Sequence, residues 1–297
     1  MSPPLDSLSV WPRFLLAFAV TTMGLCAGIT SRGAETQISA GAVITGAPAL
    51  TTPAPPVRAS DGGKPLATPA KPSPTRVLLV TGQDYPGHPW KQTAPVLAQL
   101  LEKDARLTVT TVEDPHFLDS RAVSTYDVIV LHFMNWEQAA PGTAARENLR
   151  RFVDAGKGLV LVHFACGVFQ DWPEFRNLAG RAWDPKLRGH DPRGPFRVEL
   201  SGVTHPVTQN LEPFDTDDEL YTCLAGDRPI AILATARSKV DGKDYPMAFV
   251  FSYGQGRVFH SPLGHDVKAF EAPSVGELFR RGCAWAAGLP PVPAPSR

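Results

Sequence analysis

The sequence predicts an α/β fold in which a mostly parallel central sheet carries an antiparallel extension. An unbroken apolar run over residues 158–162, with glycine at its start and His163 after it, is typical of a strand buried on both faces. Up to Gly180 the chain alternates strand-like and helix-like segments, which favours parallel pairing with helices on both faces. After Gly180 strand-like segments follow one another with little helix between them, which favours antiparallel pairing.

In the first part of the domain, predicted strands and helices alternate. The predicted strands are residues 76–81, 107–112, 126–132 and 158–162, and the predicted helices are residues 90–104 and 143–156. Thr143 is a residue type that caps a helix N-terminus, and Gly156 is the type that most often ends a helix. Threonines alternate with apolar residues in 107–112, so this strand is expected nearer an edge of the sheet.

In the second part, four more strands precede a final helix. These predicted strands are residues 196–200, 229–235, 247–252 and 257–261. Two glycines flank Gln255 between the last two strands, so we expect these strands to form a hairpin. Pro273 is suited to the first turn of a helix and Gly288 to its end, so the final helix is expected between them.

Composition divides the chain into four parts. The predicted parts are a signal peptide (1–28), a Pro/Ala/Thr-rich disordered linker (29–75), a folded domain (76–288) and a Pro-rich tail (289–297). The apolar run 14–25 follows Arg13 and precedes small residues, which predicts cleavage near Gly28 and an exported protein, periplasmic or extracellular. Two alternatives remain open: the run stays as an uncleaved membrane anchor, or Cys26 is lipidated. The linker has too few large apolar residues to form a core.

Charge and cysteine usage exclude two classes of function. The chain has 297 residues and a formal net charge of zero, without a basic run interleaved with aromatic residues, which argues against a nucleic-acid partner. Its cysteines show no Cys-x-x-Cys spacing, so a zinc knuckle is not supported. Cys166 lies between Ala165 and Gly167, which is not the electropositive setting of a nucleophilic thiol.

Three titratable residues are the candidates for catalysis: His163, Glu219 and His265. His163 ends the central strand, where α/β sheets bind ligands, and His265 follows the strand 257–261. Glu219 belongs to an acidic run, 216–221, in a loop that we expect to return over the same edge of the sheet. The three are predicted to meet, either as acid–base groups or as ligands of a divalent metal such as zinc. Purely structural roles, as a core histidine, a solvated turn and a turn held by aspartate, also remain open.

Several segments together resemble the trehalose-utilisation, or ThuA-like, family. They are Gly158–His163, Gly189-His190, Thr204–Val207 with Asn210-Leu211, Asp218–Tyr221, Pro246-Met247, Gly254–Phe259, Leu263–His265 and Gly282–Trp285, in family order over about residues 76–288. The resemblance implies a flavodoxin-like sandwich related to class I glutamine amidotransferases. The chain departs from working amidotransferases because Phe164 stands where a nucleophile elbow needs glycine and no late His-x-Glu pair follows, so glutaminase activity is not expected.

The resemblance also implies a role in the metabolism of trehalose, related disaccharides or 3-keto-glycosides. The first hypothesis is an exported hydrolase, lyase or isomerase that acts on a sugar or keto-glycoside by acid–base or metal-assisted chemistry. The residues expected to bind its substrate are His88, Trp90, Trp136, His190 and Tyr221. The alternatives are a non-catalytic carbohydrate-binding module and a structural domain. The expected partner is a small sugar, with a membrane contact only through an uncleaved N-terminal segment; nothing in the sequence indicates an oligomeric state.

Overall fold

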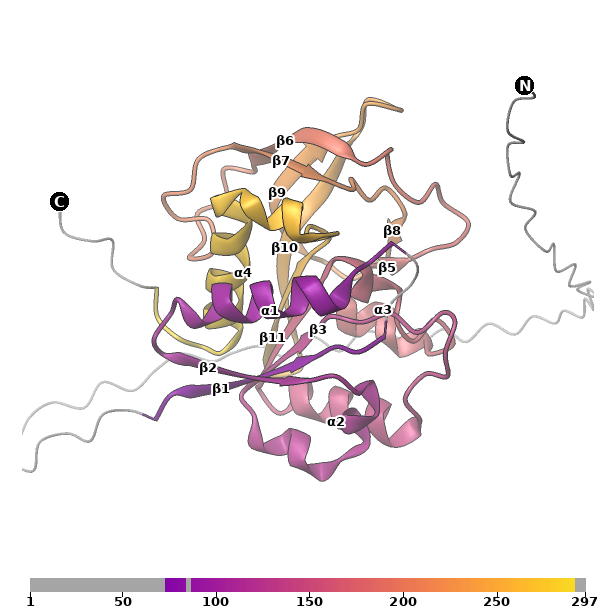
Figure 1. Cartoon of the computed structure of the whole chain (residues 1–297), viewed down its shortest axis with the longest axis vertical. Helices are drawn as coiled ribbons and strands as arrows, with labels where there is room; N and C mark the ends of the chain where they lie inside the picture. The colour runs from indigo at the N-terminus through magenta and orange to yellow at the C-terminus, as the bar shows by residue number, and fades with distance from the viewer. Residues whose placement is uncertain (1–72, 84–86, 292–297) are drawn as a thin grey trace, which may run out of the picture. The chain divides into compact units, whose positions relative to one another are not determined.

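The computed structural model describes residues 73–83 and 87–291, and its main feature is one large sheet (Figure 1). Within the described residues the sheet has nine strands in the order β2-β1-β3-β4-β11-β10-β9-β6-β7. In that order the strands are Leu107–Val112, Thr75–Val80, Val128–Leu131, Gly158–Val162, Gly256–Ser261, Asp244–Tyr253, Ala231–Arg237, Gly194–Leu200 and Phe214–Asp218. The pairs from β2 to β11 are parallel, and those from β11 to β7 are antiparallel. The predicted parallel sheet with an antiparallel extension is confirmed, as is the edge position of residues 107–112.

Helices cover both faces of the central strands. They are α1 (Trp90–Glu102), α2 (Thr143–Asp154), α3 (Pro173–Ala179) and α4 (Pro273–Ala286). Alternate residues of β1, β3 and β4 face opposite layers because successive side chains of a strand point to opposite faces. Val77, Val128 and Val160 belong to the core formed with α1 and α4, whereas Leu78, Ile129 and Leu159 belong to the core formed with α2 and α3.

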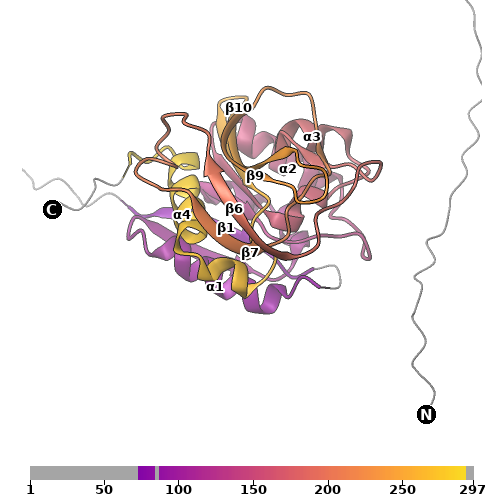
Figure 2. The ribbon, with the colours of Figure 1, turned by 90° about the horizontal axis from the view of Figure 1, so that it is seen from above.

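The antiparallel extension does not continue as a flat sheet. Phe196 and Val198 of β6 belong to the same core as Val275 and Phe279 of α4. Thr216 of β7 donates a hydrogen bond from its hydroxyl to a carbonyl of the short helix η4 (Val267–Glu271), which directly precedes α4. Figures 1 and 2 both show β6 and β7 beside α4. The curled extension therefore brings the end of β7 back toward the central strands.

Most predicted elements match the structure, and the predicted hairpin is confirmed by the pairing of Tyr253 with Gly256. Thr143 does not cap α2: the cap residue is Gly142, and a carboxylate oxygen of Asp119 accepts from the N–H of Ala145 at 2.9 Å. Besides the short 3-10 helices, four elements of the described residues were not predicted: α3, β7, and the two-residue strands β5 (Ala182–Trp183) and β8 (Leu224–Ala225), which pair with each other. The residues before Glu219 are thus an edge strand instead of a loop.

The described residues leave part of the predicted organisation untested. The predicted signal peptide, nearly all of the predicted linker and the end of the predicted tail lie outside them. The elements run from Thr75 to Ala286, and the folded domain was predicted over residues 76–288. Among the helices of residues 73–83 and 87–291, none has the length and apolar character needed to cross a membrane.

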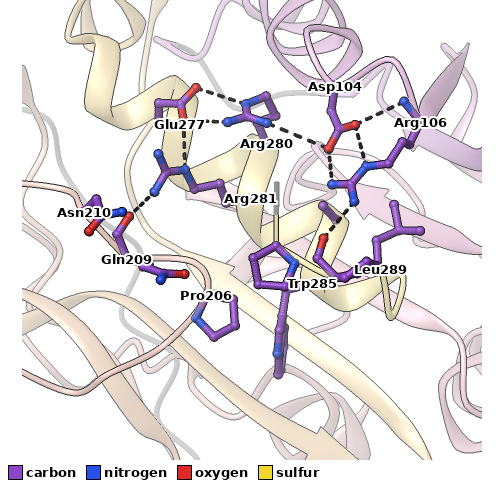
Figure 3. Close-up of a pocket in the computed structure, with 13 residues that line it drawn as sticks. Asp104, Arg106, Pro206, Gln209, Asn210, Glu277, Arg280, Arg281, Trp285 and Leu289 are labelled. Carbon is purple, nitrogen blue, oxygen red and sulfur yellow. Dashed lines mark hydrogen bonds and ion pairs between the residues drawn. The ribbon is translucent and has the colours of Figure 1, made fainter. Parts of the chain in front are cut away.

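A network of ion pairs joins α4 to the segment between α1 and β2 (Figure 3). Arg106 donates two hydrogen bonds to Asp104, at 2.9 and 2.7 Å, and Arg280 approaches the same carboxylate at 3.8 Å. Glu277 accepts from Arg280 at 2.6 Å and from Arg281 at 2.8 Å. The hydrogen bond from Arg106 lowers the pKa of the Asp104 carboxyl, although burial by itself raises it.

Replacing Asp104 with asparagine tests whether this network stabilises the fold. Because the Asp104 side chain is 3% exposed, Asp104→Asn is expected to lower the free energy of unfolding at neutral pH by about 1–3 kcal/mol. The folded-state pKa lies below the usual 3.8, so the stabilisation is present above that value and is lost as the pH falls through the folded pKa. Urea unfolding should therefore show a gap between variant and wild type that closes in strong acid. Asp244→Asn, at an exposed pair with Arg237, is the control; an equal gap at both pH values contradicts the prediction.

Candidate functional site

Four side chains meet at the carboxyl ends of the central parallel strands. His163 directly follows β4, and His265 follows β11, the parallel neighbour of β4. Glu219 directly follows β7, and His88 lies in the loop before α1. One possible ligand atom from each residue lies within 4.8 Å of those of the other three. The predicted meeting of His163, Glu219 and His265 is observed, and His88, predicted to bind substrate, joins them. We call these residues the four-residue cluster.

The Glu219 carboxylate is the centre of the cluster. Its Oε2 atom lies 3.2 Å from His265 Nδ1, 3.5 Å from His163 Nε2 and 3.9 Å from His88 Nε2. Its Oε1 atom lies 3.7 Å from Nδ1 of His190, whose side chain is 38% exposed. The side chains of the four-residue cluster itself are buried. The predicted substrate residue His190 therefore lies on the accessible side of a buried carboxylate–imidazole group.

The orientation of His163 is set by the backbone on its far side. Its Nδ1 atom lies 2.7 Å from the carbonyl oxygen of Pro262, and a carbonyl can only accept, so Nδ1 donates. In the neutral ring Nε2 is then unprotonated, and it faces Glu219 and the hydroxyl of Tyr221 at 2.9 Å. A backbone φ of 47° at His163 holds the residue in a region that non-glycine residues rarely adopt. In this neutral tautomer the imidazole presents the Nε2 lone pair to the cluster, whereas with a proton on Nε2 it can donate to Glu219.

Asp218 holds two parts of the site together. Its fully buried carboxylate accepts hydrogen bonds from the backbone N–H groups of Glu219 at 2.8 Å, Gly264 at 2.7 Å and His265 at 3.1 Å. Burial raises the pKa of Asp218, although the nearby His163 and these N–H groups favour its charged form. The end of β7 is thereby connected to the loop after β11, which places Glu219 beside His265.

The negative charge of Glu219 and the positive charge of a protonated histidine beside it stabilise each other. Burial by itself raises the pKa of Glu219, but the hydrogen bonds and charges of His163 and His265 outweigh it and hold that pKa well below its usual value. Burial by itself lowers the pKa of His265, but the hydrogen bond to Glu219 and the negative charges nearby raise it overall. The carboxylate is therefore ionised in the folded protein.

Aromatic side chains extend from the cluster toward the surface. The Tyr221 ring lies 4.5 Å from the ring of His163 and 5.4 Å from that of Trp183, which in turn lies 5.1 Å from Trp136. Trp183 was not predicted as a site residue because it belongs to the unpredicted β5. The predicted residue Trp90 contributes its backbone, whose N–H donates to the carbonyl of His88, while its ring lies 5.5 Å from Lys91 Nζ.

Cys166 has the environment that the sequence indicated. It is fully buried in a small cluster with Tyr221 and Cys223, and burial raises the pKa of its thiol well above the usual value. Because the thiolate is the reactive form, this cysteine is not placed to act as a nucleophile.

Three imidazoles and one carboxylate suit a divalent first-row transition metal better than magnesium or calcium, which prefer oxygen ligands. The hydrogen bond from His163 Nδ1 to a backbone carbonyl is the arrangement that metal-binding histidines commonly show. The sequence identified three of the four possible ligands for this purpose. The fourth, His88, follows Gly87 in the first loop at the carboxyl end of the sheet, and this position was its only signal.

Comparisons with known proteins found one matching family model and several solved structures of similar fold. A family model described as trehalose utilisation (ThuA) matches residues 76–286. A solved ThuA-like protein from Parabacteroides merdae is 26% identical, with a TM-score of 0.67 over 75% of this chain and 94% of that one. A ThuA-like protein from Bacteroides uniformis is 20% identical, with a TM-score of 0.60 over 75% and 95%. A cytoplasmic protein of Salmonella typhimurium is 12% identical, with a TM-score of 0.51 over 71% and 99%.

The search of curated proteins found no match. The structures below 25% identity agree in fold, and the family match identifies the domain that forms most of the chain. The protein therefore belongs to the ThuA family, whose function is related to trehalose utilisation.

Proposed function

We propose that the domain is a metal-assisted enzyme that acts on a sugar or keto-glycoside related to disaccharide utilisation. The observation that carries the proposal is the four-residue cluster, in which three imidazoles and one carboxylate turn donor atoms toward the same buried space. Such a set binds a divalent ion through unprotonated nitrogen and ionised oxygen. An ion that accepts more ligands than these side chains supply keeps positions for oxygens of the substrate.

The groups around the cluster suit a polyhydroxylated substrate. When bound, the metal would polarise a carbonyl or hydroxyl oxygen and stabilise negative charge on it. Burial raises the pKa of Tyr221 well above its usual value, so its hydroxyl is protonated and can donate a hydrogen bond at the cluster. Trp136 and Trp183 are partly exposed and can pack against the apolar face of a sugar ring. A sugar with a keto group would offer both an acidic C–H bond and an oxygen to polarise.

A non-catalytic carbohydrate-binding module is the second candidate. The same aromatic side chains favour it, because stacking on a sugar does not need the titratable cluster. The two candidates differ in what the loss of Glu219 does: it abolishes turnover in an enzyme, whereas a module of this kind keeps its affinity for the sugar.

Elemental analysis and a glycoside screen test the metal-assisted function. The purified protein, reconstituted with zinc, manganese, cobalt or nickel, is expected to bind one ion per chain and to melt at a higher temperature with it. Glu219→Gln should abolish the melting shift and lower turnover of glycosides or keto-glycosides by about 10²–10⁴. Glu199→Gln, at an exposed pair with Arg197, is the control. Absence of bound metal in the reconstituted wild type would sink the metal proposal.

Asp218→Asn tests whether the buried carboxylate aligns the cluster. An amide can accept at one atom only, so at least one of the three backbone N–H groups loses its partner. The affinity for the metal is expected to fall by about 10–100-fold, and the visible spectrum of the cobalt-loaded protein should change. Asp217→Asn, one residue earlier and facing Lys268 and Arg193, is the control. Unchanged metal affinity and an unchanged cobalt spectrum would show that Asp218 has no aligning role.

We propose further that the protein is exported. The apolar run 14–25, preceded by Arg13 and followed by small residues, supports this proposal. N-terminal sequencing of the protein recovered from the periplasm or medium is expected to begin near Gly28. A protein that starts at Met1 in the soluble cytosolic fraction contradicts the proposal.

A further inference from the structure

A cavity of about 690 Å³ lies at the opposite end of the sheet from the four-residue cluster (Figure 3). Gly158, at the start of β4, lies against Ala286 at the end of α4, and Arg257, near the start of β11, donates to the carbonyl of Trp285 at 3.1 Å. The last turn of α4 therefore lies at the amino end of the strands whose carboxyl ends carry His163 and His265. The volume is in the range of small-molecule sites.

The polar lining of this cavity is already paired. Three arginines and two carboxylates line it, and these are the members of the ion-pair network of Asp104, Arg106, Glu277, Arg280 and Arg281. The guanidinium of Arg106 also donates to the carbonyl of Pro290 at 2.7 Å, and that of Arg281 donates to the carbonyl of Gln209 at 2.5 Å. The paired carboxylates therefore reduce the attraction of these arginines for an anion.

Two amides and one indole complete the lining. The side-chain amides of Gln209 and Asn210 have no hydrogen-bond partner among residues 73–83 and 87–291, and Trp285 contributes the aromatic part of the wall. Proline rings at positions 206, 290 and 291, whose φ angles are fixed, limit the movement of the rim. The amides of Gln209 and Asn210 are exposed, so they can donate to and accept from an occupant of the cavity.

A neutral polyhydroxyl compound matches this wall best. Each hydroxyl donates and accepts at the same time, so it can bind beside paired guanidinium and carboxylate groups without breaking the pairs. The C–H face of a sugar ring can lie against the part of the Trp285 indole that the Arg257 guanidinium, 5.5 Å from the ring centroid, and the His205 ring leave uncovered. We propose that the cavity is a second, non-catalytic binding site for a neutral mono- or disaccharide.

Some residues of the cavity belong to segments that carry the resemblance to the ThuA family. Two segments that carry the resemblance to the ThuA family, Thr204–Val207 with Asn210 and Gly282–Trp285, contribute Pro206, Asn210 and Trp285 to the cavity. None of these residues belongs to the cluster at the carboxyl end.

Fluorine NMR of the full chain, labelled with 5-fluorotryptophan, tests the proposal site by site. The chain has six tryptophans, and Trp285→Phe assigns the resonance of Trp285. Trehalose or methyl glucoside is expected to shift this resonance saturably, in Glu219→Gln as well as in wild type. Retention in Glu219→Gln separates this site from the cluster, whose proposed function can fail while this binding persists.

Asn210→Gly is the test variant that keeps the backbone. Asn210 has a φ of 59°, which glycine adopts without strain, so the change removes the amide and little else. It should weaken sugar binding by roughly five-fold, whereas Thr204→Ala, in the same loop but outside the lining, should not. The proposal is overturned if Trp285 does not respond to neutral sugars, if it responds to glucose 6-phosphate alone, or if only Trp136 and Trp183 respond.

Discussion

The arrangement of the site depends on the carboxylate of Asp218. In the order of the sheet, β7 is an outer strand, separated from β11 by β10, β9 and β6. The three N–H groups that Asp218 accepts nevertheless come from both sides of this gap, namely from Glu219 and from the loop of Gly264 and His265. The curl of the extension over α4 makes this contact possible, and the contact then keeps the curl in place.

Burying the adjacent carboxylates of Asp218 and Glu219 costs free energy, and different groups stabilise each of them. Asp218 receives backbone N–H groups, which stabilise its charge without adding one. Glu219 receives imidazole edges instead, and it is surrounded by His88, His163, His190 and His265. The Asp218 carboxylate is thus stabilised by hydrogen bonds from the protein backbone. The arrangement around Glu219 directs imidazole nitrogens and a carboxylate at the same space, and an added cation would be stabilised there.

The sequence predicted those site residues whose position follows from the strand pattern. His163 and His265 end or follow apolar runs, and parallel neighbours must end at the same edge of a sheet. The acidic run drew attention to Glu219, but β7 itself was missed because its inward-facing positions are polar: Thr216 and Asp218 are buried while Asp215 is exposed. A strand without apolar alternation has no period-two signal.

Other features were missed because they depend on contacts distant in the sequence. Trp183 lies in a two-residue strand that exists only through its pairing with β8, and α3 is too short for a clear helical period. Thr143 has the chemistry of a cap, yet the acceptor that completes the first turn of α2 comes from Asp119, outside the helix. Trp90 is near the site in sequence, but its ring is directed to Lys91.

The two ends of the sheet differ in the partners of their carboxylates. This difference favours the carboxyl end as the place of the proposed reaction. At the amino end each carboxylate of the cavity wall accepts a hydrogen bond from an arginine, so the negative charges of the wall are paired. Such a surface suits the neutral ligand proposed for the cavity better than it suits a reaction that develops charge. At the carboxyl end the ionised Glu219 faces imidazoles whose protonation or metal binding can change. In the proposed function, a cation bound at this end would stabilise a substrate oxygen that gains negative charge.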